Sequence, residues 1–246
     1  MQDYRYYVLN WKEKLLCIGI TVTMAGAISW LFYRNVYVMA GGVLLYRPVE
    51  TSVRTRRLEK RKSEMLFQFK DMLQMISAAL KAGASMEHGF VHAREEFEKL
   101  YGTQAVMTQE LIWITHQVNL NVPLEELVEN LAERSGLEEI NSFVQVFVFA
   151  RRSGGDFMRI FRNTADKIRE KAEVTREIET VMAAKRLEMN IMNLVPFGIL
   201  LYVGISSPEF LEPLYGNPVG AGIMTVALGV YGCTCKMAEK MVKIQV

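Results

Sequence analysis

Two histidines one helical turn apart are the first residues whose types and spacing suggest chemistry. His88 and His92 are four residues apart, and Glu95 and Glu96 follow within reach of the same helical face. Imidazole nitrogens and carboxylate oxygens in such an arrangement can bind zinc. Histidine pairs are common on charged helix surfaces without any metal, so we expect neither a metal site nor a cofactor.

Catalytic motifs are missing from the sequence. It contains no G-x-x-x-x-G-K-[ST] phosphate loop, no G-x-S-x-G elbow, no H-E-x-x-H pair and no C-x-x-C pair. The three cysteines, Cys17, Cys233 and Cys235, fall in or at the edge of apolar segments, where packing is favoured over lipidation or metal binding. The chain is therefore not expected to be an enzyme.

A basic cluster, RTRRLEKRK, runs from Arg54 to Lys62. Such a cluster can bind nucleic acid, but this one directly follows an apolar segment of membrane-spanning character. There it is better suited to fixing membrane topology and to contacting anionic lipid headgroups. We expect membrane lipid, and no nucleic acid, as its partner.

The first predicted helix is an apolar segment near the N-terminus. Residues 15–33 carry no charge, and their length matches the roughly 20 residues that a helix needs to cross a bilayer. A second apolar run, residues 36–46, predicts a short return span after a hairpin at Arg34 and Asn35. A cleaved signal peptide is the alternative, but the apolar run continues past the small residues at 25–27.

A second pair of spans is expected near the C-terminus. From Leu187 to Cys235 there is no Lys or Arg, and two apolar stretches flank a loop at residues 206–220 that carries only Glu209 and Glu212. Because Lys and Arg accumulate on the cytoplasmic side of spans, this loop is predicted outside. Four spans, with both termini inside, satisfy the charge distribution.

The central part of the chain predicts a helical domain. Apolar residues recur at helical spacing from Met65 to Leu80, and glycines at 83, 102 and 136 suit helix ends. A last helix begins near Asp156 and has no Gly or Pro before Pro196, so it should continue into the third span. Its apolar seam, Phe157 to Ala172, suits either the domain's own core or a contact between subunits.

The predicted fold class is all-α: a multi-pass membrane protein with a helical bundle between two pairs of spans. The expected segments are a transmembrane hairpin at 1–47, a basic cytoplasmic linker at 48–64, a cytoplasmic helical domain at 65–186, a transmembrane pair at 187–235 and a cytoplasmic tail at 236–246.

Three segments carry a resemblance to a known family. FQFKDMLQMISAALKAGASMEHGF (67–90), NVPLEELVENLAERSG (121–136) and FVFARRSGGDFMRIFRNTADKI (147–168) occur in that order before a span that contains proline. This arrangement resembles the type II secretion F-domain family. Having one F domain with spans on both sides, the chain is similar to the tight-adherence (Tad/Flp) pilus assembly branch.

The resemblance implies a platform in the inner or plasma membrane that couples a cytoplasmic secretion ATPase to the insertion or extraction of pilin subunits. General secretion members carry two tandem F domains, so a single-domain chain implies pairing with itself or with a second platform subunit. Some relatives have an acidic residue before the Ser-Gly turn; Arg151 and Arg152 stand there, so no metal site is carried over.

Six residues mark the turns of the F domain. We expect them to shape the bundle as turns and caps, with direct partner contact as the less favoured alternative; they are Gly83, Ser85, Pro123, Ser153, Gly154 and Gly155.

A membrane-anchored signalling or receptor protein is the alternative function. Only residues 206–220 are predicted outside, which is short for a sensor domain. A transporter is less favoured, because the predicted spans hold almost no charged residue.

Overall fold

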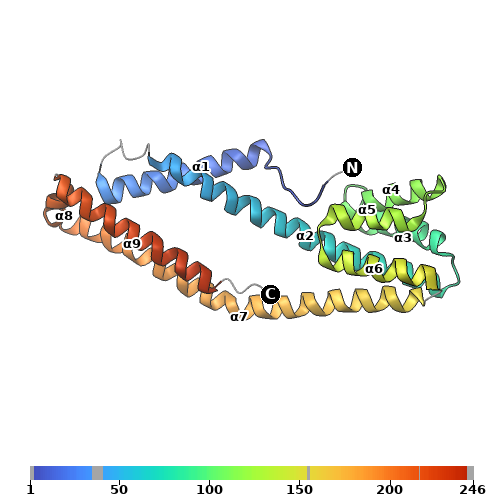
Figure 1. The fold of residues 1–246 in the computed structure, drawn as a ribbon. Helices are drawn as coiled ribbons and strands as arrows, with labels where there is room; N and C mark the ends of the chain where they lie inside the picture. Colours follow the sequence, from blue (N-terminus) through green and yellow to red (C-terminus); the bar gives the residue numbers. More distant parts are fainter. Residues whose placement is uncertain (1–2, 35–40, 154–155, 216, 243–246) are drawn as a thin grey trace. The chain divides into compact units, whose positions relative to one another are not determined.

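The computed structural model describes residues 3–34, 41–153, 156–215 and 217–242, and within these ranges it contains helices and no strand. The expected all-α class is therefore confirmed (Figure 1). The chain divides into two compact units. We call Met1–Val8 with Arg54–Val174 the bundle unit, and Leu9–Val53 with Thr175–Val246 the span unit.

The helices begin and end close to the positions that the sequence predicts. Gly83, Gly102 and Gly136 all have positive φ and lie just after helices, as the glycine pattern indicates. The elements in chain order are α1 (Trp11–Ile28), a π-helix η1 (Ser29–Tyr33), α2 (Val43–Lys81), α3 (Met86–Tyr101), α4 (Val106–Asn119), α5 (Leu124–Ser135), α6 (Glu138–Ser153), α7 (Phe157–Ser206), α8 (Pro208–Tyr215) and α9 (Pro218–Val242).

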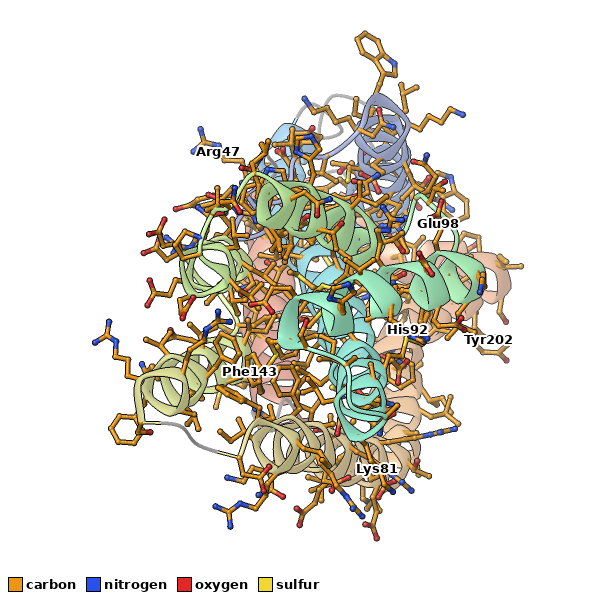
Figure 2. The ribbon with its side chains drawn as sticks, turned by 90° about the vertical axis from the view of Figure 1, so that its right-hand side faces the viewer. Arg47, Lys81, His92, Glu98, Phe143 and Tyr202 are labelled. Atoms are coloured by element: carbon orange, nitrogen blue, oxygen red, sulfur yellow. The ribbon has the colours of Figure 1, made fainter. Side chains whose placement is uncertain are left out.

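An aromatic cluster forms the centre of the bundle unit. Phe143 of α6 packs edge-on against Phe69 of α2 at 5.5 Å between ring centroids, and against Phe161 of α7 at 5.0 Å. Such aromatic pairs contribute about 0.5–1.5 kcal/mol each beyond the burial of their area. Figure 2 labels Phe143 among the side chains of this unit.

The seam on α7 packs mainly into its own bundle. Phe161, Ala165 and Ile168 are buried in the same cluster, and Phe157 is partly buried against it. Ala172, the last residue of the seam, is exposed. Of the two roles left open by the sequence, the structure shows the first four seam positions in the core of the bundle unit.

Three helices of the described residues are long and apolar enough to cross a membrane. They cover Trp11–Tyr33, part of Phe157–Ser206, and Pro218–Ala238. Helix α7 has 50 residues, which is about 75 Å at 1.5 Å per residue, and it contains Pro196. The expected continuation of the last domain helix into a candidate span is therefore confirmed.

Three regions differ from the sequence expectation or lie partly outside the described residues. Residues 206–220 were expected to form a loop, but they include helix α8, whose Pro208 and Glu209 suit a helical first turn. The predicted second span at 36–46 lies in part outside the described residues, so the expected count of four spans stays a prediction. The basic segment 48–64 is helical throughout and belongs to α2.

Candidate functional site

The turn between α2 and α3 is built by Gly83. With φ at +90°, Gly83 adopts a conformation that side chains with a Cβ rarely take. The Gly83 N–H donates to the Leu80 carbonyl at 3.0 Å, and the Ala84 N–H donates to the Ala79 carbonyl at 3.1 Å. This pair of bonds is the Schellman arrangement, which satisfies carbonyls at the end of a helix.

Ser85 then caps the next helix. Its hydroxyl oxygen accepts the backbone N–H of His88 at 3.3 Å, and lies 3.0 Å from the His88 Nδ1. The capping bond satisfies one of the free N–H groups at the start of α3. Within the described part of the chain, no group of three His, Cys, Asp or Glu side chains is placed to hold a metal ion.

Arg151 joins three helix ends. Its Nη2 lies 3.1 Å from a carboxylate oxygen of Glu87 in the first turn of α3, and its Nε lies 2.8 Å from a carboxylate oxygen of Glu125 in the first turn of α5. Arg151 itself is in the last turn of α6. Acidic groups at helix starts and a basic group at a helix end all complement the helix dipole.

This contact brings together turns that are far apart in the sequence. Glu87 lies two residues after Ser85, Glu125 lies two residues after Pro123, and Arg151 lies two residues before Ser153. The turns at Ser85, Pro123 and Ser153 therefore lie close to one end of the bundle unit. We call the Glu87, Glu125 and Arg151 contacts the end junction.

The electrostatics of the end junction are modest. A hydrogen bond from its own backbone N–H, with help from Arg151, lowers the pKa of Glu87 against the opposing effect of partial burial. The Glu87 side chain is 43% exposed, so solvent screens the pair. The junction therefore orients helix ends more than it adds stability.

Two of the remaining predicted turn residues, Pro123 and Ser153, flank helices of the junction. Pro123 is exposed and directly precedes α5, one position earlier than the expected first turn, with its carbonyl accepting the N–H of Leu127 at 3.4 Å. Ser153 is exposed, and its hydroxyl donates to the Phe149 carbonyl at 3.0 Å. Gly154 and Gly155 lie outside the described residues.

A buried ion pair is the most elaborate polar contact of the bundle unit, and sequence reasoning missed it. Arg134 of α5 donates two hydrogen bonds to the carboxylate of Glu110 of α4, at 2.7 and 2.6 Å, and its Nε donates to Asn130 at 2.7 Å. The side chains are 14% and 5% exposed. A two-pronged pair of this kind fixes geometry as well as charge.

Tyr4 completes this cluster from the other end of the chain. The Tyr4 hydroxyl donates to Glu110 at 2.6 Å, and the Tyr4 backbone N–H donates to the Arg134 carbonyl at 3.0 Å. Burial and the bond to Glu110 raise the pKa of the Tyr4 hydroxyl, so it stays protonated as a donor. We call Tyr4, Glu110 and Arg134 the buried triad, and the segment 3–8 that it holds the N-terminal strap.

One signal in the sequence points to the buried triad. Glu110 lies three residues after Met107 and four before Ile114, on the apolar face of its helix. A carboxylate on such a face needs a partner, because an unpaired buried charge is costly. Periodicity does not identify this partner as Arg134, which lies 24 residues further along the chain.

Known proteins provide an independent comparison for this helical domain. The family described as "Type II secretion system (T2SS), protein F" matches residues 72–205, more than half of the chain. Searches of curated proteins and of solved structures found no significant match. The match begins inside α2 and ends inside α7, so it covers the helical domain and the first span after it. The chain therefore belongs to the type II secretion system protein F family.

Proposed function

We propose that this protein is the inner-membrane platform of a Tad/Flp-type pilus, and that its bundle unit engages a cytoplasmic secretion ATPase. Members of the family are membrane platform proteins of type II secretion and type IV pilus systems, and this chain is such a protein in general terms. The pilus branch, the ATPase, the pilin subunits and pairing with itself or with a second platform subunit are part of the proposal.

The observation that carries the proposal is the shared helix α7. Its first part, with Phe161, Ala165 and Ile168, packs in the core of the bundle unit, and its last part forms a candidate span. The single helix α7 therefore begins in the bundle unit and continues into the span unit. Movement imposed on the bundle by an ATPase has a direct covalent route to the membrane.

The N-terminal strap supports the proposed topology. Because Tyr4 bonds to Glu110 and Arg134, the chain before α1 lies on the same side of the membrane as the bundle. The helix over Trp11–Tyr33 is long enough for one crossing. In the proposed topology the chain crosses back before Arg54, where the bundle unit resumes, through the second span predicted at 36–46.

The side of the membrane follows from charge. Arg54, Arg56, Arg57 and Lys60 are exposed on α2 where it enters the bundle unit. Basic residues next to spans accumulate in the cytoplasm. The proposal therefore places the bundle (65–186) and both termini inside, and the segment with α8 outside. The turn residues Gly83, Ser85 and Pro123 shape the cytoplasmic bundle.

Site-specific photocrosslinking in the native host tests the proposal. A photoreactive residue would replace exposed Gln109 of α4 or Gln145 of α6 in the bundle unit, and exposed Glu209 of α8 as the matched control. We expect crosslinks to a secretion ATPase from the two bundle positions and none from position 209. Deletion of the gene should also remove Flp-type pili from the cell surface.

The same experiment separates the alternative. Repeated crosslinking of the bundle positions to a kinase or response regulator would support a signalling protein and contradict the platform proposal. Crosslinking of the ATPase from position 209 would overturn the proposed orientation while leaving the family assignment intact.

A further inference from the structure

A small notch opens within the span unit where η1, α7 and α8 meet. It holds about 60 Å³, and it is lined by Trp30, Leu31, Arg34, Leu201, Ile205 and Tyr215 among others. The Tyr215 hydroxyl donates to the Leu31 carbonyl at 2.7 Å, which ties α8 to the end of η1. Two of its walls belong to candidate spans, so the notch lies where spans end.

Local backbone geometry places a cation at this notch. The last turn of the first candidate span is the π-helix η1. Such π-helical turns are rare in proteins, and those that occur are often found at functional sites. Arg34 follows it with φ at 45°, in the left-handed region that residues other than glycine seldom adopt. Its guanidinium carbon lies 5.6 Å from the centroid of the Tyr215 ring.

The charge of Arg34 is not neutralised by a carboxylate of the described residues. Its side chain is exposed, and its guanidinium lies over the face of the Tyr215 ring. Within the described part of the chain, no Asp or Glu oxygen lies within 4.0 Å of it. A long basic side chain at the end of a span reaches the membrane interface, where lipid headgroups carry the phosphates.

The size and lining of the notch restrict that partner. Pockets for small molecules hold about 300–1,000 Å³, so this notch admits only a group of a few heavy atoms. A guanidinium binds phosphate through paired N–H donors. Trp30 and Ile205 beside it are 58% and 73% exposed, so apolar chains can lie against them at the level of the bilayer.

We propose that this notch binds the phosphate of an anionic phospholipid, with Arg34 as the phosphate ligand, Tyr215 as the platform that holds the guanidinium, and the exposed span residues as the surface for the acyl chains. The inference concerns the span unit alone, and it does not depend on which ATPase or pilin the bundle serves. Bound lipid would fix η1, α7 and α8 against one another at the notch.

The test measures lipid binding to the full chain purified in detergent. Native mass spectrometry with added phosphatidylglycerol would be compared among the wild type, Arg34→Gln, Leu201→Trp and Arg47→Gln. Leu201→Trp fills the notch and leaves Arg34 in place. Arg47→Gln is the matched control, because Arg47 is an exposed arginine on α2 that does not line the notch. Circular dichroism would verify the helical content of each variant.

For the most tightly bound phosphatidylglycerol molecule, we expect at least tenfold weaker binding in Arg34→Gln and in Leu201→Trp. Its binding should be unchanged in Arg47→Gln. Unchanged binding in Leu201→Trp would overturn the proposal even if Arg34→Gln failed to fold. Equal losses in Arg34→Gln and Arg47→Gln would show general electrostatic attraction and overturn it too. Competition by soluble glycerol 3-phosphate would identify a free-phosphate site and overturn the lipid assignment.

Discussion

Replacing Glu110 by Gln should destabilise the bundle unit severely. The change keeps the shape of the side chain but removes the charge that pairs with Arg134, whose side chain is only 14% exposed. Removing one partner of a buried ion pair costs about 3–5 kcal/mol, because the other charge stays buried without compensation. That is a large fraction of the 5–15 kcal/mol that typically stabilises a domain, and it corresponds to a fall in melting temperature on the order of 10 °C.

Trp113 provides a local reporter for this measurement. The guanidinium carbon of Arg134 lies 5.8 Å from the Trp113 ring, and the chain has three tryptophans in all. In a Trp11→Phe, Trp30→Phe background, the fluorescence of Trp113 would follow unfolding of the bundle unit of the full chain in detergent. Glu96→Gln is the matched control, since Glu96 pairs with Lys99 at 2.9 Å on the exposed surface. Such fully exposed pairs contribute little to stability, because water screens them.

Two results would refute the reasoning. One is a melting temperature for Glu110→Gln no lower than that of Glu96→Gln. The other comes from the double variant Glu110→Met, Arg134→Met, which replaces both charges by apolar side chains. Because replacing a whole buried pair is often neutral or stabilising, the double variant should recover much of the lost stability. Additive losses would show that the pair is not energetically coupled.

Three smaller predictions concern the end junction and its turn. Gly83→Ala should lower stability by about 1–2 kcal/mol, because the left-handed conformation strains any Cβ although nothing lies within 4 Å of it; thermal denaturation would measure this. Ser85→Ala should cost about 1 kcal/mol through loss of the helix cap, whereas Ser85→Asp should retain most of it. Arg151→Met should weaken the bundle most at neutral pH. The pKa of Glu87 is lowered below its ordinary 4.5, so the ion pair contributes to stability above pH 4.5. This contribution is lost as the pH falls through the lowered pKa. The melting temperatures of the wild type and the variant should therefore converge in acid.

Helix boundaries were predictable because the signals for them are local. Gly83 and Gly136 lie just past helix ends with positive φ, and the cap at Ser85 involves a residue only three positions away. The apolar face of α7, likewise, follows from the spacing of Phe161, Ala165 and Ile168. Backbone geometry and side-chain periodicity within one helix are encoded in neighbouring residues, so they can be read without knowing the fold.

The contacts that assemble the helices were not predictable in the same way. Tyr4 and Glu110 are 106 positions apart, and Arg151 is 64 positions from Glu87. Periodicity shows which face of a helix is buried but not which helix covers it. Arg151 and Glu87 also resemble ordinary surface charges in the sequence, and only the packing of α3, α5 and α6 shows that they meet.

The chain passes between the bundle unit and the span unit at three places, and these differ in kind. At 53–54 and 174–175 the connection lies inside helices α2 and α7. At 8–9 it lies in non-helical chain before α1, held to the bundle by the bonds of Tyr4. A helix resists bending because its backbone is bonded along its length, whereas the N-terminal strap can leave the bundle when a few side-chain and backbone bonds break. Force applied to the bundle unit should therefore pass to the span unit mainly through α2 and α7, and the N-terminal strap is the connection that can detach without unfolding a helix.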